Sequence, residues 1–189
     1  MVSCARALCA SALLLCACAS TQTAALRLPP MRLSSTRGEV QVLPSPRAPL
    51  TALVFFSADC DCQRAHDARL RELYQRYRGR GVDLLVVDSE VAASLVRDAA
   101  LARQRAYPFG VLIDHGGRLA HALEAEYATY SVVIDAAGQV RFRGGIDSDY
   151  RDLHDDARFY LRDALDDLLA GRPVRAPEAK TLGCALRLW

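Results

Sequence analysis

The segment that most constrains the fold is a strand pattern that changes into a helical pattern at a pair of cysteines. Residues 51–57 form a nearly continuous apolar and aromatic run, and its length suits a strand that is buried on both faces. From Cys62 to about Arg78 the apolar residues recur at helical spacing, and Gly79 follows. A strand buried on both faces needs a layer of helices on each side, so this segment predicts an α/β sheet.

The rest of the body alternates in the same way. Apolar patterns predict further strands at 38–43, 82–88, 109–113, 130–135 and 140–143, and helices at 91–105, 117–123 and 153–170. This order predicts a largely parallel sheet with helices on both faces. The turn at 136–139 joins the last two strands as one late antiparallel hairpin. The predicted fold class is therefore α/β with a central mixed sheet.

The first 19 residues predict an export signal. Residues 7–17 are apolar or small and follow Arg6, but they are fewer than the roughly 20 apolar residues of a membrane-spanning helix. The run Leu15–Cys18 resembles a bacterial lipobox, so we expect a lipoprotein of the cell envelope, anchored to the membrane by lipidated Cys18. Cleavage after Ala19 is the alternative, and it would give a soluble periplasmic protein.

We expect one domain with flanking segments. Residues 20–37 are rich in Ser, Thr, Ala, Arg and Pro, which is typical of a flexible tether. Residues 38–175 form the predicted domain, and residues 176–189 form a tail. Basic and acidic residues are nearly balanced, with a formal net charge of +2 and no clustering, so no nucleic-acid partner is expected.

The body carries three cysteines, Cys60, Cys62 and Cys184. Cys60 is expected to open a helix, where the partial positive charge and the free N–H groups of the helix stabilise a thiolate. Arg64 would add positive charge, whereas the two aspartates beside Cys60 act against the thiolate. We therefore expect Cys60 to be the nucleophile, with a moderately lowered pKa, in a compartment where disulfides persist.

Two thiols compete to resolve a disulfide formed on Cys60. Cys62 is two residues away, and a bridge between the two would close a small, strained ring. Cys184 could reach Cys60 if the tail folds back, and closing so long a loop would stabilise the fold by roughly 4–5 kcal/mol. A purely structural disulfide is therefore an alternative. Three thiols cannot all pair within one chain, so at least one stays free or exchanges.

Several blocks resemble a known family. Residues 55–60 are similar to the approach to the active-site cysteine in thioredoxin-like proteins. More specifically, the body resembles the redoxin family (alkyl hydroperoxide reductase/thiol-specific antioxidant group), in its peroxiredoxin-like thiol–disulfide branch. The matching blocks are 107–109, 132–144, 160–165, 171–173 and 183–186, within residues 38–189. The resemblance implies a thioredoxin-like fold and a redox-active Cys60, and we expect no cofactor.

The chain departs from the family pattern at positions that handle peroxide. Ser57 keeps a hydroxyl three residues before the cysteine, but Leu53 stands where peroxiredoxins have proline. Thr129 takes the place of the thioredoxin cis-proline, and Tyr130 follows it where an arginine is expected. Gln63 stands at the usual position of the second cysteine. These changes remove groups that would bind and polarise a peroxide.

We therefore predict an exported thiol–disulfide oxidoreductase that uses Cys60, with protein thiols and disulfides of the cell envelope and an unidentified thiol reductant as partners. The first alternative is a thiol peroxidase with a sulfenate on Cys60. The second is a Cu(I)-binding module of Cys60, Cys62 and His66, because Cys62 and His66 share a helix face and suit a soft metal. The third is a tethered structural domain with a vestigial site.

Overall fold

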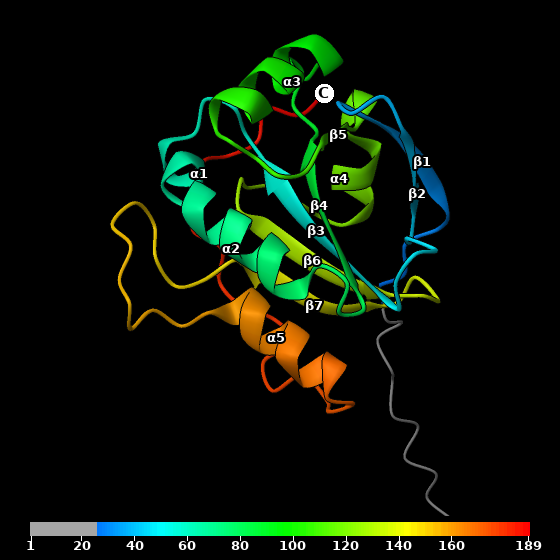
Figure 1. The fold of residues 1–189 in the computed structure, drawn as a ribbon, viewed down its shortest axis with the longest axis vertical. Coiled ribbons are helices and arrows are strands. Elements are labelled where there is room, and N and C mark those ends of the chain that lie inside the picture. Colours follow the sequence, from blue (N-terminus) through cyan, green and yellow to red (C-terminus); the bar gives the residue numbers. More distant parts are fainter. Residues whose placement is uncertain (1–25) are drawn as a thin grey trace, which may run out of the picture.

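A computed structural model describes residues 26–189, so the predicted signal and Cys18 lie outside the described residues. Seven strands form one mixed sheet in the order β2-β1-β5-β4-β3-β6-β7 (Figure 1). Strands β3, β4 and β5 are parallel, and every other neighbouring pair is antiparallel. The bounds are β1 Met31–Ser35, β2 Val40–Leu43, β3 Leu50–Phe56, β4 Val82–Asp88, β5 Val111–Ile113, β6 Tyr130–Asp135 and β7 Val140–Gly145. The predicted α/β class, mixed sheet and late hairpin are confirmed.

The helices are α1 Asp61–Ala65, α2 Asp67–Tyr77, α3 Leu95–Gln104, α4 Arg118–Ala122 and α5 Tyr160–Leu169. The helix predicted from Cys62 is interrupted at His66, whose imidazole bonds back to a carbonyl of α1. The last helix begins seven residues later than predicted, at Tyr160 rather than Leu153. The residues before it form a loop that Arg69 holds through Asp149 and the carbonyl of His154.

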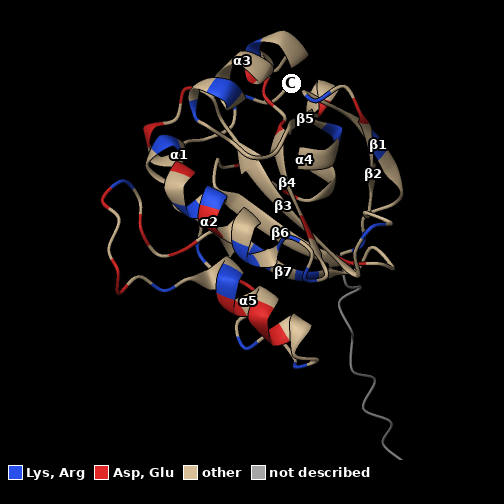
Figure 2. Ribbon diagram, in the orientation of Figure 1, with Lys and Arg blue, Asp and Glu red and all other residues tan. Residues whose placement is uncertain are grey.

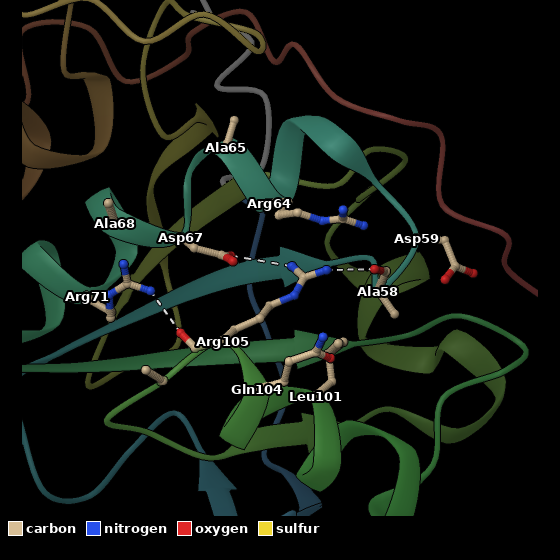
Figure 3. Close-up of a pocket in the computed structure, with 11 residues that line it drawn as sticks. Ala58, Asp59, Arg64, Ala65, Asp67, Ala68, Arg71, Leu101, Gln104 and Arg105 are labelled. Carbon is tan, nitrogen blue, oxygen red and sulfur yellow. Dashed lines mark hydrogen bonds and ion pairs between the residues drawn. The ribbon is translucent and has the colours of Figure 1, made fainter.

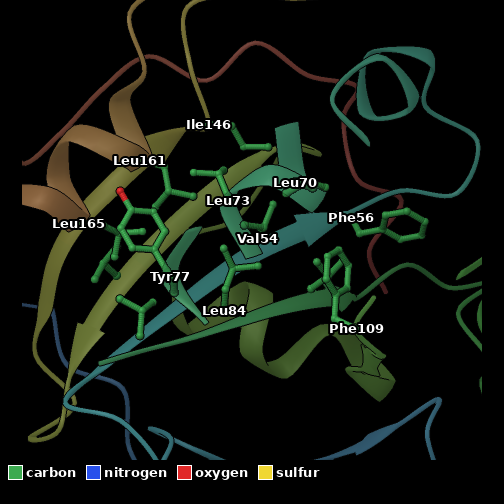
Figure 4. Packing of buried hydrophobic residues seen from close by; sticks show 14 of the residues in the cluster. Val54, Phe56, Leu70, Leu73, Tyr77, Leu84, Phe109, Ile146, Leu161 and Leu165 are labelled. Carbon is green, nitrogen blue, oxygen red and sulfur yellow. The ribbon is translucent and has the colours of Figure 1, made fainter. Parts of the chain in front are cut away.

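Strand β3 supplies both hydrophobic cores, and all of its residues are buried, as predicted. Val54 and Phe56 face a core that α2 and α5 cover (Figure 4). Leu53 and Phe55 face the opposite core, which α4 and the C-terminal tail cover. Charged residues lie mostly on the outer helices and loops, and the strands of the sheet are mostly uncharged (Figure 2). The alternation of β3 therefore fixes the sheet between two apolar layers.

The segment before the predicted domain differs from expectation. Residues 31–35, which the composition placed within the tether, form strand β1 and pair antiparallel with β2 and β5. Leu33 and Ser35 are buried. The strand escaped prediction because its short alternation is embedded in serines and arginines that usually mark loops. Within residues 26–189, the helices are all too short and polar to cross a membrane.

Candidate functional site

The turn after β3 places Cys60 where the sequence predicts it. Strand β3 ends at Phe56, and Cys60 is the N-cap residue of α1 with an extended backbone. The strand lies in the parallel centre of the sheet, so this turn is at the carboxyl edge, where α/β proteins commonly carry their sites. The first N–H groups of a helix have no partner within it, and here the N–H of Gln63 acts on the Cys62 thiol and lowers its pKa.

Three sulfur atoms meet at this turn. Cys60 forms a disulfide with Cys184, across a sequence separation of 124 residues and a Cα–Cα distance of 5.8 Å. The Sγ of Cys62 is a free thiol 3.0 Å from the Sγ of Cys60. Cys60 and Cys62 are buried, whereas Cys184 is partly exposed. In this structure the tail cysteine, and not the near neighbour, is bonded to Cys60.

Burial controls the protonation of the third thiol. Burial raises the pKa of Cys62, and this effect outweighs the backbone amide of Cys184, which lowers that pKa. Only the thiolate attacks a disulfide, so Cys62 is a poor nucleophile around neutral pH while it is covered. The next residue, Gln63, is also fully buried, and its side-chain amide has no hydrogen-bond partner in the described part of the chain.

The tail that brings Cys184 to the site lies along the segment before β6. The N–H of Ala128 donates to the carbonyl of Cys184 at 2.9 Å, and the N–H of Leu186 donates to the carbonyl of Glu126 at 2.8 Å. Thr129 has a left-handed backbone with φ 69°, and its hydroxyl donates to the carbonyl of Leu182 at 3.1 Å. Thr129 therefore takes part in the site by binding the tail.

Ser57 reaches the tail through an acidic residue. Its hydroxyl donates to Glu90 at 3.0 Å, and the guanidinium of Arg187 contacts Glu90 at 3.3 Å. Arg187 also donates to Asp59 at 2.7 Å, and this hydrogen bond is the main reason that the pKa of Asp59 is lowered. Sequence patterns gave no sign of Glu90 or Arg187, because neither residue belongs to a periodic pattern or a motif.

Arg64 lies to one side of the sulfur atoms. It is exposed and pairs with the carboxylate of Asp61 at 3.8 Å. The expected stabilisation of a Cys60 thiolate by Arg64 therefore has no contact in the structure to support it. Arg64 lines an open cavity of about 830 Å³ beside the turn (Figure 3). Arg105 crosses the floor of this cavity, donating to the carbonyl of Ala58 at 2.7 Å and pairing with Asp67 at 3.4 Å.

His66 faces away from the thiols. Its Nδ1 donates to the carbonyl of Cys62 at 2.7 Å, and its Nε2 lies 3.2 Å from Asp147. Burial lowers the pKa of His66, but these two hydrogen bonds outweigh it and the pKa is raised. An imidazole that donates from both nitrogens cannot ligate a metal. The expected ligand set of Cys60, Cys62 and His66 is therefore corrected, because the third group near the two sulfurs is Cys184.

A buried acid ends the strand next to β3. Asp88 lies beside Phe56 in the parallel register, and it accepts a hydrogen bond from the N–H of Glu90 at 2.9 Å. Burial raises the pKa of Asp88 to about 7, although the hydrogen bond from Glu90 opposes this and the charge of Asp98 adds to it. The carboxyl edge of the sheet thus holds a group that titrates near neutral pH.

The chain resembles several solved structures in its fold. No protein-family model matches the chain, and no curated protein matches it. An uncharacterized conserved protein from Geobacillus kaustophilus has a similar structure, with a TM-score of 0.79, 24% identity, and coverage of 87% of this chain and 92% of that one. A thioredoxin-like protein from Aeropyrum pernix has a TM-score of 0.53 at 18% identity, covering 63% and 83%.

A candidate thiol:disulfide interchange protein DsbE from Chlorobium tepidum is also similar, with a TM-score of 0.55 at 19% identity, covering 63% of this chain and 82% of that one. These likenesses show a thioredoxin-like fold, which confirms the predicted fold. The redoxin branch stays a prediction.

Proposed function

We propose that this chain is a thiol–disulfide oxidoreductase in which Cys60 and Cys184 form the redox couple. The observation that carries the proposal is the cluster of three sulfur atoms at a strand-to-helix turn, with two of them joined and the third in contact. The fold shared with the candidate DsbE protein from Chlorobium tepidum supports the same class of chemistry. A purely structural disulfide would not need a free thiol beside it.

In the reduced protein, the thiolate of Cys60 attacks one sulfur of a substrate disulfide. The substrate S–S bond breaks, one substrate thiolate leaves, and a mixed disulfide joins Cys60 to the substrate. The thiolate of Cys184 then attacks the Sγ of Cys60, releases the second substrate thiolate and forms the Cys60–Cys184 bond. Two electrons pass from the protein to the substrate, and the protein is left with its Cys60–Cys184 disulfide.

Cys62 is the internal alternative to Cys184. Its Sγ is 3.0 Å from the Sγ of Cys60, so an attack on Cys60 would form a Cys60–Cys62 bond and release Cys184 as a thiolate. Because burial raises the pKa of Cys62, this exchange is slow around neutral pH and accelerates as the pH rises. Cys62 therefore provides a route that frees the tail without an external thiol.

Reduction of insulin disulfides by dithiothreitol, followed by turbidity, tests the proposal in the full chain. Cys60→Ser should abolish the acceleration of this reaction. Cys62→Ser should keep most of it, and Cys184→Ser should accumulate a mixed disulfide on Cys60 that mass spectrometry detects. Undiminished activity in Cys60→Ser would reject the proposal.

We further propose that the protein works in the cell envelope, anchored through Cys18 and acting on protein thiols with an external thiol reductant. The support is the lipobox-like run in the sequence, which lies outside the described residues. Metabolic labelling with a fatty acid should mark the wild-type protein and not Cys18→Ser. A protein released into the periplasm without label would indicate the alternative cleavage after Ala19.

A second candidate function is Cu(I) binding by the reduced protein. The ligand atoms of Cys60, Cys62 and Cys184 all lie within 4.8 Å of one another, and three thiolates suit a soft cation. Reduced protein should then retain one Cu(I) against a competing chelator, and Cys184→Ser should lose it while His66→Gln keeps it. No observation of the site favours peroxide reduction, since Leu53 and Tyr130 stand where the family that the chain resembles has proline and arginine.

A further inference from the structure

We propose that residues 182–187 occupy a peptide-binding groove, and that the substrates are extended, cysteine-bearing segments that take their place. This inference rests on the proposed function and names the substrate class of the same site. The segment lies between two edges: residues 126–129 before β6, and residues 90–91 after β4. We call this space the tail groove.

The tail is held in the groove largely by main-chain atoms. Ala128 donates to the carbonyl of Cys184, Leu186 donates to Glu126, and the N–H of Val91 on the opposite edge donates to the carbonyl of Arg187 at 2.9 Å. Tyr127 and Ala185 form an antiparallel bridge. Main-chain hydrogen bonds of this kind do not depend on the side chains of the bound segment, so another extended peptide can reproduce them.

The residue before the cysteine meets the tightest constraint. A Cβ added to Gly183 would lie 1.9 Å from the carbonyl oxygen of Ala128, and its three nearest neighbours would all be backbone atoms of Ala128. No side chain can be accommodated there without moving the segment away from Ala128. The groove therefore selects glycine immediately before the reacting cysteine.

The residues after the cysteine meet different surroundings. The next residue, Ala185, is exposed, so this position tolerates many side chains. Leu186 is only 9% exposed and packs in the core that also contains Cys60 and Cys62. Arg187 contacts the carboxylates of Glu90 and Asp59. The favoured sequence is thus glycine, cysteine, any residue, an apolar residue and a basic residue.

The tail must leave before a substrate can enter. Cys60 is 1% exposed while the tail is in place, so an incoming disulfide cannot reach its sulfur. Once the Cys60–Cys184 bond is reduced, only non-covalent contacts retain the tail, and a peptide in solution competes with a segment at high effective concentration. Weakly matched thiols lose this competition, which gives the groove its selectivity.

A peptide series tests the groove in the full-length Cys62→Ser/Cys184→Ser protein. The probe is Leu-Gly-Cys-Ala-Leu-Arg, acetylated and amidated, with its cysteine joined to thionitrobenzoate. Attack by Cys60 on the peptide sulfur releases yellow thionitrobenzoate and leaves a Cys60–peptide disulfide. A peptide with alanine in place of glycine should react at least about tenfold more slowly, equivalent to about 1.4 kcal/mol. A control peptide with serine after the cysteine should match the probe.

Two outcomes distinguish the inference from the proposed function. Equal rates for all three peptides would overturn the groove but leave exchange at Cys60 standing. No release by any peptide would overturn the proposed function, and the groove with it. In the same background, Gly183→Ala should speed reaction of the probe because the tail can no longer seat, whereas Ala176→Ser, at an exposed position outside the tail groove, should leave the rate unchanged. An unchanged or lower rate in Gly183→Ala would contradict the tail as the occupant.

Discussion

The Cys60–Cys184 disulfide closes a loop with a sequence separation of 124 residues, which covers most of the chain. Cross-linking so long a loop removes entropy from the unfolded chain, and the loop-entropy relation gives about 5 kcal/mol at 25 °C. The native tail keeps its hydrogen bonds to Ala128 and Glu126 when the bond is absent, so the folded state changes little. We therefore expect Cys184→Ser to lower the free energy of unfolding by about 3–5 kcal/mol.

Urea unfolding of oxidised protein measures this loss. Both proteins should carry Cys62→Ser, because this substitution prevents a Cys60–Cys62 bond from replacing the lost one. With a urea dependence of about 2 kcal/mol per molar, the midpoint of Cys62→Ser/Cys184→Ser should fall by about 2 M relative to Cys62→Ser alone. Adding a reductant should bring the midpoints of the two proteins together. Identical midpoints under oxidising conditions would refute the argument, because they would mean that no bond constrains the unfolded chain.

Three further substitutions test the surroundings of the site. The pKa of His66 is raised in the folded state by Asp147, so its contribution is complete below about pH 6.5 and lost as the pH rises through the folded value. The difference in unfolding free energy between wild type and His66→Gln should therefore shrink from pH 5.5 to pH 8.5, as urea titrations at about these pH values would show. Arg187→Gln should speed reduction of the disulfide by a phosphine, measured as thiol release, because the contacts of Arg187 with Asp59 and Glu90 that hold the tail are lost. Arg32→Gln, at an exposed position on β1, should leave the rate of reduction unchanged. Burial raises the pKa of Asp88 to about 7, so the contribution of this carboxyl to stability falls as the pH rises from about 4 to about 7. Thermal unfolding should therefore show Asp88→Asn gaining stability relative to wild type over this pH range. A parallel slope in Asp88→Asn would assign the effect to another group.

The centre of the fold is readable from sequence because continuous apolar runs require burial on both faces. The predicted strands at 82–88 and 130–135 coincide with β4 and β6. The predictions were wrong where contacts between distant parts of the chain determine the local structure. The start of α5 depends on a loop that Arg69 ties down from another helix, and β1 depends on two partner strands. No local pattern encodes either contact.

The candidate site divides in the same way. The position of Cys60 follows from the change of periodicity, which is a local signal. Its partner does not, because the choice between Cys62 and Cys184 depends on how the tail folds back. The path of the tail is determined by backbone contacts of Gly183 and Cys184 with Ala128, and such contacts produce no periodic pattern in the sequence. Helical spacing places His66 near Cys62 but does not determine which way the imidazole nitrogens point, so it indicated a metal ligand that the structure turns away from the sulfur atoms.

The loop closed by the disulfide also imposes an order in time. All of the described helices, and strands β4 to β7, lie between Cys60 and Cys184. A chain that is made from its N-terminus therefore contains all of its described helical segments before the second cysteine is synthesised. Until then Cys60 is an open thiol, and a pulse of alkylating reagent would label it in nascent chains and spare it in finished, oxidised ones. The presence of the bond thus indicates that the last helix has been synthesised and that the tail has bound in the tail groove.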